Sequence, residues 1–202
     1  GMAADALLVT ASDANGAGVY LVETDALQRQ AQRTSDGDLA AMITFASTPA
    51  ARVGGALLAE RLGQLLVALA AAEQLGVTQG ALRLTSEYAK TREQFGRPIG
   101  TFQAVSQRLA DGFIDVLGQR LTLWQAIWRL EQGLPAATEV ATAKLWAADA
   151  GHRIAHTTIH VHGGVGIDLD GEAHRYFTSG KRFEFLFGGA TEQALAIGRS
   201  FA

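Results

Sequence analysis

The pattern of hydrophobic and polar residues along the chain changes near residue 50. Before this point, short apolar runs alternate with polar clusters, which is typical of strands. The runs cover Ala6–Thr10, Gly18–Glu23 and Ala41–Ala46. Between the first two, Asp13-Ala14-Asn15-Gly16 is a turn sequence that favours a hairpin. Because three or four short strands bury little surface, we expect this segment to need other sequence to cover it.

After residue 50, apolar positions recur at helical spacing, and proline and glycine interrupt them. The predicted helices are Ala51–Lys90, Phe102–Glu131, Thr138–His162, Glu172–Phe185 and Thr191–Phe201. The side chains expected to face inward in the first helix are Leu58, Leu62, Leu65, Leu69, Leu75 and Leu82. Those expected in the second are Leu109, Phe113, Val116, Leu117, Leu121 and Trp124. Long antiparallel helices with short connections predict a mainly α fold, a four-helix bundle with a small N-terminal β segment.

The pattern also predicts a division of the chain into a β segment over residues 1–49 and a helical bundle domain over residues 50–202. The first long helix contains Gly63, Gly76 and Gly80, which lower helix propensity. We therefore expect close packing of another element against these glycines.

Composition narrows the class of protein. The chain has 202 residues, of which 48% are hydrophobic, and this is enough for a sizeable core. A net charge of −3 without a basic run argues against nucleic acid and anionic membrane as partners. Charged and polar residues interrupt every apolar stretch, so we expect no membrane span. The absence of cysteine excludes disulfides and fits a reducing compartment, and we expect a cytoplasmic protein.

Two motifs carry a family resemblance. The first is the run Tyr88-Ala-Lys-Thr-Arg92-Glu-Gln94-Phe95-Gly96-Arg-Pro98-Ile99-Gly100-Thr-Phe102-Gln103. It closely resembles the connection between two long helices in the C-terminal domain of acyl-CoA dehydrogenases. The second, His160-Val161-His162-Gly163-Gly164-Val165-Gly166, resembles that family's Gln-Ile-x-Gly-Gly-x-Gly. The resemblance extends over the whole chain, and residues 3–50 are similar to the second half of the family's middle β-domain.

The resemblance implies an FAD cofactor shared across a subunit interface. Arg92 would supply a permanently charged fork for the pyrophosphate. Gly163 and Gly164 lack a Cβ, so a ligand could reach their backbone N–H groups. His160 stands where the family has glutamine, and its reach and donor count differ. The full set of implied cofactor-binding residues is Arg92, Gln94, Phe95, Ile99, Phe102, Gln103, His160, Gly163 and Gly164.

Simpler interpretations of these residues stay open. Phe95 and Phe102 could be core side chains that flank a turn. Arg92 could be a helix cap or an ion-pair partner, and Gly163-Gly164 could be an ordinary helix stop. His156 and His160 have the i, i+4 spacing of metal ligands, and His162 lies close by. Without a neighbouring glutamate or any cysteine, we predict no metal site.

The residue that removes the α-proton is missing. In the family a glutamate does this, because burial can raise a carboxyl pKa toward neutrality. An ungapped count from Lys181 places Phe187 at that position, and aligning the aromatic residue places Gly188 there. A minority of members carry the base on the first long helix, where this chain has Leu66. Glu73, about two turns further along, is a weak candidate. Glu60 and Glu192 are better explained as solvated or capping residues.

The sequence therefore predicts an acyl-CoA dehydrogenase-like flavoprotein subunit, an oxidoreductase component acting on the CH–CH bond of an acyl-CoA. It would be a partial or degenerate subunit without its own base. We expect a homo-oligomer (dimer or tetramer) or a hetero-oligomer with a base-bearing dehydrogenase subunit. The alternative is a non-enzymatic assembly subunit that keeps the bundle only for oligomerisation. We expect the isolated chain to bind FAD weakly or not at all and to have little or no activity.

Overall fold

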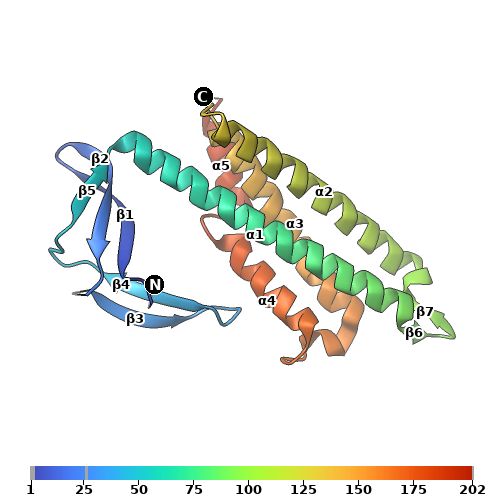
Figure 1. The fold of residues 1–202 in the computed structure, drawn as a ribbon. Helices are drawn as coiled ribbons and strands as arrows, with labels where there is room; N and C mark the ends of the chain where they lie inside the picture. The colour runs from blue at the N-terminus through green and yellow to red at the C-terminus, as the bar shows by residue number, and fades with distance from the viewer. Residues whose placement is uncertain (1–2, 26, 202) are drawn as a thin grey trace. The chain divides into compact units, whose positions relative to one another are not determined.

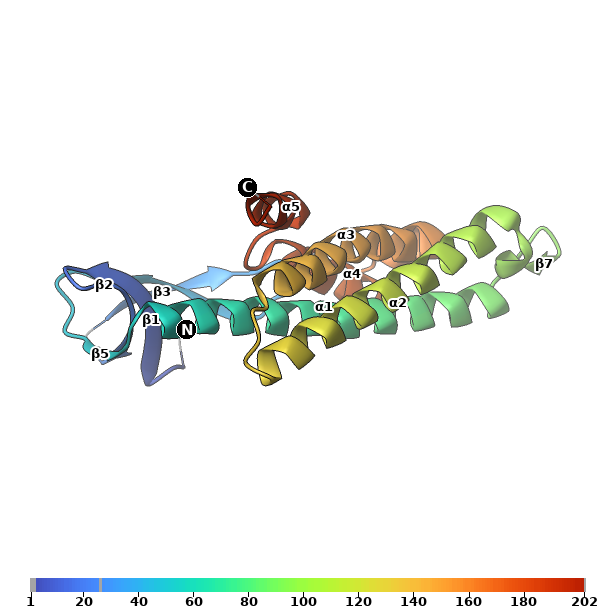
Figure 2. The same cartoon turned by 90° about the horizontal axis from the view of Figure 1, so that it is seen from above.

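A computed structural model describes residues 3–25 and 27–201 of the protein (Figures 1 and 2). The chain divides into two compact units, Gly1–Leu65 and Leu66–Ala202. The first contains the strands of the N-terminal segment, and the second is a bundle of helices. The predicted mainly α fold with a small β segment is confirmed.

The N-terminal unit contains an antiparallel sheet and a separate hairpin. In the sheet, β2 (Gly16–Glu23) lies between β1 (Ala6–Asp13) and β5 (Ala51–Gly54). The hairpin consists of β3 (Gln28–Arg33) and β4 (Leu39–Thr44). The turn predicted between β1 and β2 is confirmed, because its first and last residues, 13 and 16, pair across the ladder.

Two strands of the N-terminal unit were not predicted. β3 has the sequence Gln-Arg-Gln-Ala-Gln-Arg, and its side chains are almost all exposed, so no hydrophobic pattern marks it. Backbone pairing with β4 forms this strand. The prediction of helix from Ala51 is wrong, because residues 51–54 pair with β2 and the helix begins at Ala56. Gly54 separates the two elements, and a Cβ there would lie 2.3 Å from the Leu58 side chain.

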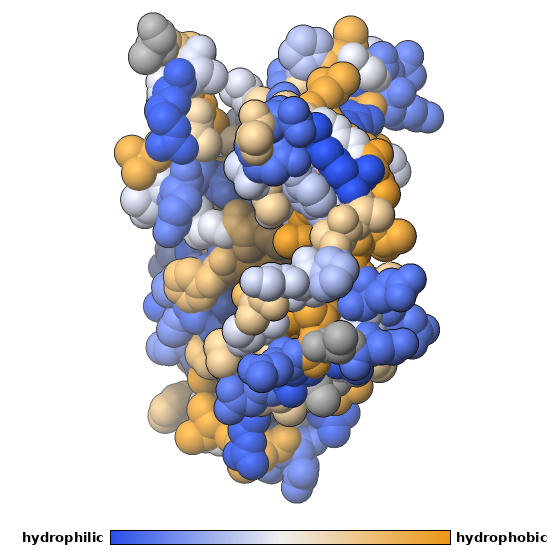
Figure 3. All heavy atoms as spheres, turned by 90° about the vertical axis from the view of Figure 1, so that its left-hand side faces the viewer, coloured by the Kyte–Doolittle hydropathy of each residue, from blue (hydrophilic) through white to orange (hydrophobic). Residues whose placement is uncertain are grey.

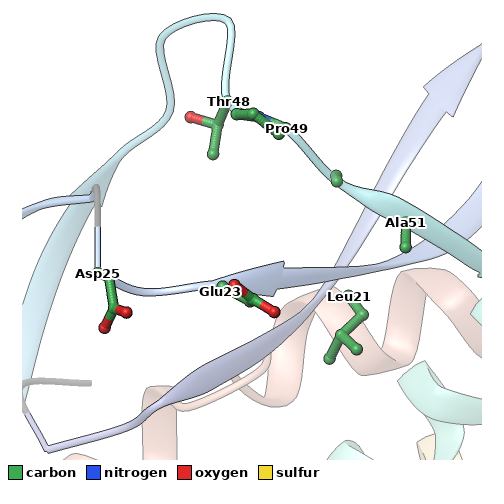
Figure 4. A pocket seen from close by; sticks show the side chains of 7 residues that line it. Leu21, Glu23, Asp25, Thr48, Pro49 and Ala51 are labelled. Atoms are coloured by element: carbon green, nitrogen blue, oxygen red, sulfur yellow. The ribbon is translucent and has the colours of Figure 1, made fainter.

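The β unit buries few side chains. Among the residues described, Val19, Val22 and Thr24 have its buried side chains, and Gly18 is buried beside them. Large apolar side chains remain exposed, namely Leu8, Leu21, Leu39, Met42, Phe45 and Val53. Figure 3 shows apolar residues at the surface among polar ones. A hollow of about 390 Å³ opens between β2 and residues 48–51 (Figure 4). This surface matches the expectation that the segment needs further sequence to cover it.

The helical unit is a bundle centred on α3. Helix α3 packs against α2, α4 and α5, and both views show it among its neighbours (Figures 1 and 2). A short hairpin and a 3-10 turn join α1 to α2, and a second 3-10 turn joins α3 to α4. The helices are α1 (Ala56–Thr91), α2 (Gln103–Glu131), α3 (Ala137–His162), α4 (Glu172–Phe185) and α5 (Ala190–Arg199). The connecting elements are β6 (Glu93–Gln94), β7 (Arg97–Pro98), η1 (Ile99–Thr101) and η2 (Gly163–Ile167).

Small side chains form most of the core where α1, α2 and α3 meet. Alanine lets helix backbones approach closely, and the larger α1 residues that pack against this core, Val67 and Leu75, are only partly buried. The main buried cluster is Ala68, Ala71, Leu123, Ala126, Leu130, Ala136, Val140, Ala143 and Ala147. By length and composition, α1 also meets the criteria for a helix that crosses a membrane, as core helices often do.

Several residues predicted to face inward are exposed. Leu58, Leu65 and Leu69 of α1 lie at the surface, because its buried face carries alanine, threonine and glutamine instead. Of the three glycines expected at close contacts, only Gly80 meets a neighbour, since a Cβ there would lie 2.5 Å from the Tyr176 ring. The remaining two, at positions 63 and 76, face open space. Leu75 and Leu82 do pack against the core, so periodicity located the helix and identified its inward face only in part.

The predicted stripe of α2 is also largely exposed. The inward face of α2 carries Val116, Leu123, Ala126 and Leu130. The apolar stripe on the other face consists of Phe113, Leu117, Leu121, Trp124 and Trp128. Such a contiguous exposed apolar surface marks an interaction site more often than a solvated one.

We predict that Leu121→Glu weakens any association through this stripe without unfolding the protein. Leu121 is 70% exposed, so the substitution leaves the core intact while placing a charge in the stripe. Light scattering after size-exclusion chromatography should show a smaller mass with an unchanged helical circular dichroism spectrum. Gln107→Glu, an exposed position of α2 outside the stripe, is the control. An unchanged mass for Leu121→Glu would contradict the assignment.

Candidate functional site

The connection between α1 and α2 projects an aromatic side chain from the end of the bundle. Gln94 pairs with Arg97 across the β6–β7 hairpin. Phe95 and Gly96 both have left-handed backbone angles, φ +54° and +75°, as the tight hairpin turn of this kind requires. The Phe95 side chain therefore projects into solvent instead of packing in the core, and 93% of its surface is exposed. The interpretation of Phe95 as a core residue is wrong.

Phe102 stabilises the base of this hairpin. Its ring meets that of Phe95 edge to face, with centroids 6.1 Å apart. The guanidinium carbon of Arg97 lies 4.2 Å from the Phe102 ring centroid, which is within cation–π distance. Ile99 is partly buried beside it, and Gln103 is exposed at the first position of α2.

Arg92 lies directly after α1 and is exposed. Its backbone N–H donates to the Tyr88 carbonyl at 2.8 Å, and its own carbonyl accepts from the Ile99 N–H at 2.8 Å. The backbone is thus fixed on both sides. No ion pair joins its guanidinium to another residue of the described ranges. The charge is available for an anionic ligand.

The end of α3 supplies open backbone. Gly163 ends the helix with φ +65° and ψ −142°, a combination that essentially only glycine adopts. No atom lies within 4 Å of the place where a Cβ on Gly163 or Gly164 would be. The helix-stop interpretation is thus correct, and the backbone is also accessible to a ligand. His160 is exposed one turn earlier.

An aromatic contact brings the two segments together. The rings of Tyr88 on α1 and His162 on α3 stack with centroids 4.2 Å apart. The ends of α1 and α3 therefore lie side by side, and the exposed groups around them form what we call the nucleotide edge, defined as Arg92, Gln94, Phe95, Gln103, His160, Gly163 and Gly164. A cation, an exposed aromatic ring and exposed glycine backbone suit the phosphate and ring groups of a dinucleotide such as FAD.

The positions at which the sequence comparison expected the base hold no acidic residue. Phe187 is 46% exposed and has φ +59°, which costs a non-glycine residue roughly 1–2 kcal/mol. Gly188 follows with φ +96°, and Leu66 is partly buried on α1. Glu73 is exposed and lines a hollow of about 400 Å³ together with Tyr176. Neither Phe187, Gly188 nor Leu66 can accept a proton.

The other two carboxylates considered, Glu60 and Glu192, are exposed. Glu60 accepts a hydrogen bond from Gln64 at 3.0 Å on the same helix. Glu192 lies in the first turn of α5, where negative charge is favourable. Both observations agree with the solvated and capping roles expected.

A buried charged cluster next to the α4–α5 turn was missed by the sequence analysis. Lys144 is fully buried, and its Nζ donates to the carbonyls of Phe183 and Glu184 at 3.0 Å each. These carbonyls belong to the last turn of α4, where carbonyl groups have no backbone N–H partner within the helix. The Glu184 carboxylate contacts His152 at 3.1 Å and Lys181 at 2.5 Å. A lysine within an alanine-rich helical face was the only signal for this cluster.

The histidines form aromatic contacts. His156 packs near His152, with ring centroids 4.5 Å apart, and edge to face against Phe177. Burial lowers the pKa of His156, and the neighbouring positive groups His152 and Lys181 lower it further. His162 is turned toward α1. Within the described ranges, no three or more His, Asp or Glu side chains are grouped as metal ligands.

Comparison with known proteins identifies relatives. The family model for the acyl-CoA dehydrogenase C-terminal domain matches residues 54–201. The acyl-CoA dehydrogenase FadE27 of Mycobacterium tuberculosis is 51% identical over 100% of this chain and 58% of its own length. A chain of the ChsE4-ChsE5 complex from the same organism superposes with a TM-score of 0.95 at 50% identity, covering 100% of this chain and 56% of that chain.

A second solved structure is a variant of the Tcur3481-Tcur3483 steroid ACAD. One of its chains has a TM-score of 0.94 and 39% identity, and the match covers 98% of this chain and 55% of that chain. The chain therefore spans just over half the length of the relatives that it matches.

We predict a pH-dependent stability from Lys144. Burial lowers its pKa from 10.5 to about 8. Between these values the unfolded chain binds more protons than the folded one, so the free energy of unfolding rises with pH. The unfolding free energy of wild type minus that of Lys144→Met should therefore increase from pH 8 to 10.5. Its slope should approach about 1.4 kcal/mol per pH unit. Urea titrations measure it.

The control for this prediction is Lys90→Met, which removes an exposed lysine from α1. Its unfolding free energy should stay parallel to that of wild type over the same pH range. Parallel curves for wild type and Lys144→Met would contradict the lowered pKa.

Proposed function

This chain belongs to the acyl-CoA dehydrogenase family, and we propose that it is a cofactor-presenting subunit of a dehydrogenase complex whose catalytic base lies on another subunit. One observation carries this proposal. The nucleotide edge keeps its exposed cation, aromatic ring and open glycines, while the base positions hold Phe187, Gly188 and Leu66. The groups proposed to bind the cofactor are retained, whereas the positions expected for the base hold no residue that can accept a proton.

We propose that the nucleotide edge holds the adenosine and pyrophosphate part of FAD. Arg92 would form a charge-assisted hydrogen bond to the phosphates. The exposed backbone at Gly163 and Gly164 would let the cofactor approach closely, because neither residue has a Cβ. The Gly163 N–H itself already donates to the Ile159 carbonyl. Phe95 would pack on a ring system of the cofactor, and Gln94, Gln103 and His160 would supply polar contacts. Ile99 and Phe102 would stabilise the base of the β6–β7 hairpin. When bound, FAD accepts a hydride from the β-carbon of an acyl-CoA.

An assembly is required for this function. Two of the similar solved structures are complexes of two different chains, ChsE4-ChsE5 and Tcur3481-Tcur3483. The exposed stripe of α2 provides an apolar surface for a subunit contact. We propose a hetero-oligomer with a base-bearing dehydrogenase subunit. The similarity to a chain of a steroid ACAD favours a CoA thioester with a bulky polycyclic acyl group as substrate of the complex.

The alternative function is a structural subunit that keeps the bundle only for assembly. The loss of the base and the substitution of His160 for glutamine favour it. Flavin content separates the two proposals, because a purely structural subunit would not change how the complex holds FAD.

We predict that Arg92→Ala lowers the FAD content of the complex. The experiment is to purify the complex through a tag on this chain and to measure flavin absorbance per protein. Removing a charge-assisted hydrogen bond to phosphate should weaken FAD binding by about tenfold or more. Arg83→Ala removes an equally exposed arginine from α1 and should leave the flavin content unchanged. Equal flavin in both variants would favour the structural alternative.

We predict that Glu73 is not the base. In the complex, Glu73→Gln should keep kcat for acyl-CoA oxidation within about twofold, because another subunit accepts the α-proton. Removal of a general base normally costs about 10²–10⁴ in rate. A loss of that size in kcat, with KM retained, would place the base on this chain and overturn the proposed division of roles.

A further inference from the structure

The stacked rings of Tyr88 and His162 lie between the two segments of the nucleotide edge. Tyr88 belongs to the last turn of α1, and His162 is the last residue of α3. Their ring centroids are 4.2 Å apart and their planes differ by 23°. Arg92 follows the first ring by one helical turn, and Gly163 follows the second directly. The stack therefore joins the last turn of α1 to the last residue of α3, next to both segments of the nucleotide edge.

The orientation of His162 is fixed. The residue is buried, and its Nδ1 lies 2.8 Å from the Thr158 carbonyl oxygen. A carbonyl oxygen can only accept, so Nδ1 carries the proton and donates. Behind the histidine, a Cβ on Gly166 would lie 3.1 Å from the His162 Cβ, so the following turn packs closely against it. The ring is held in one rotamer against Tyr88.

The position of Tyr88 in turn determines the position of the Arg92 backbone. The Tyr88 carbonyl accepts the Arg92 N–H at 2.8 Å, and the Arg92 carbonyl accepts the Ile99 N–H at 2.8 Å. Movement of Tyr88 would thus displace the backbone of Arg92 and the base of the hairpin together. On the other side, Gly163 turns the chain out of α3 immediately after His162.

We infer that Tyr88 and His162 are positioning residues, and that their stack sets the register between Arg92 and the open backbone at Gly163 and Gly164. This inference rests on the proposed function, because the separation of Arg92 from Gly163 and Gly164 matters only if both segments bind the same cofactor. A phosphate and an adenosine of one cofactor can be bound together only if both segments keep a fixed separation. The stack is a contact of ring on ring, so any planar aromatic pair should preserve it.

The experiment measures the dissociation constant of FAD for the purified complex, by flavin fluorescence, in two matched pairs of variants. His162→Gln keeps a side-chain donor but removes the ring, whereas His162→Phe keeps the ring. Tyr88→Leu removes the other ring, and Tyr88→Phe keeps it. Loss of an aromatic contact of this kind should weaken FAD binding by about three- to tenfold. The ring-keeping variants should stay within about twofold of wild type.

A stability control separates positioning from general damage. Thr85 and Thr158 also contact each other across α1 and α3, with hydroxyl oxygens 3.2 Å apart. Thr85→Val removes this buried contact one turn further from the edge and should lower the melting temperature without weakening FAD binding. If FAD affinity instead followed melting temperature in all variants, including His162→Phe and Thr85→Val, the positioning role would be overturned.

Two outcomes distinguish this inference from the proposed function. If Arg92→Ala weakens FAD binding while Tyr88→Leu and His162→Gln do not, the stack has no positioning role and the proposed function stands. If Arg92→Ala also leaves the affinity unchanged, the nucleotide edge does not bind the cofactor and both proposals are wrong.

Discussion

The close packing of α3 against its neighbours is the constraint on which the helical unit depends. Ala143, Ala147 and Ala150 are almost completely buried along this helix. A larger side chain at these positions would overpack the interface and force the helices apart. Gly151 is under the same constraint, since a Cβ there would lie 1.5 Å from the Gln74 amide nitrogen. Small residues along its length thus set where the end of α3 lies.

That packing also determines which residues are left for other molecules. Because alanine and threonine fill the space between the helices, Leu69 of α1 and the apolar stripe of α2 are exposed. An isolated soluble domain gains nothing from tryptophans at its surface, whereas a subunit interface does. At the end of the bundle, the same geometry exposes Arg92 and Phe95. The fold therefore leaves both the apolar stripe of α2 and the candidate cofactor-binding groups at its surface.

Buried polar groups accompany this alanine-rich core. Thr78 and Gln119 lie within hydrogen-bond distance of each other at 3.2 Å between α1 and α2. Thr85 and Thr158 do the same between α1 and α3. Such contacts add little net stability, but they disfavour other registers in which a polar group would be left unpaired. They fix one alignment of the helices, which the alanines alone would leave less defined.

The sequence predicted the helices well because glycine and proline mark their ends. Gly133 and Gly163 end α2 and α3 as expected, both with positive φ. The buried faces were predicted less well, because the strongest apolar residues serve surfaces that the chain alone does not cover. Strand β3 escaped detection because its stability comes from backbone pairing.

The candidate site was predictable only in part. The motif located Arg92, Gly163 and Gly164, but their proximity depends on the contact between Tyr88 and His162, which no local pattern encodes. The exposure of Phe95 follows from two successive left-handed residues, for which Gly96 was the sole sequence signal. Lys144 and its carbonyl partners are 39 and 40 residues apart, so their pairing appears only in the folded chain.

If this chain completes a cofactor site on another subunit, it should raise that subunit's affinity for FAD. The most direct test is the dissociation constant of FAD for the base-bearing subunit, measured alone and with saturating amounts of this chain. We expect binding at least about tenfold tighter in the presence of this chain, because a charged phosphate contact is added. An unchanged dissociation constant in a complex that forms normally would contradict the proposal.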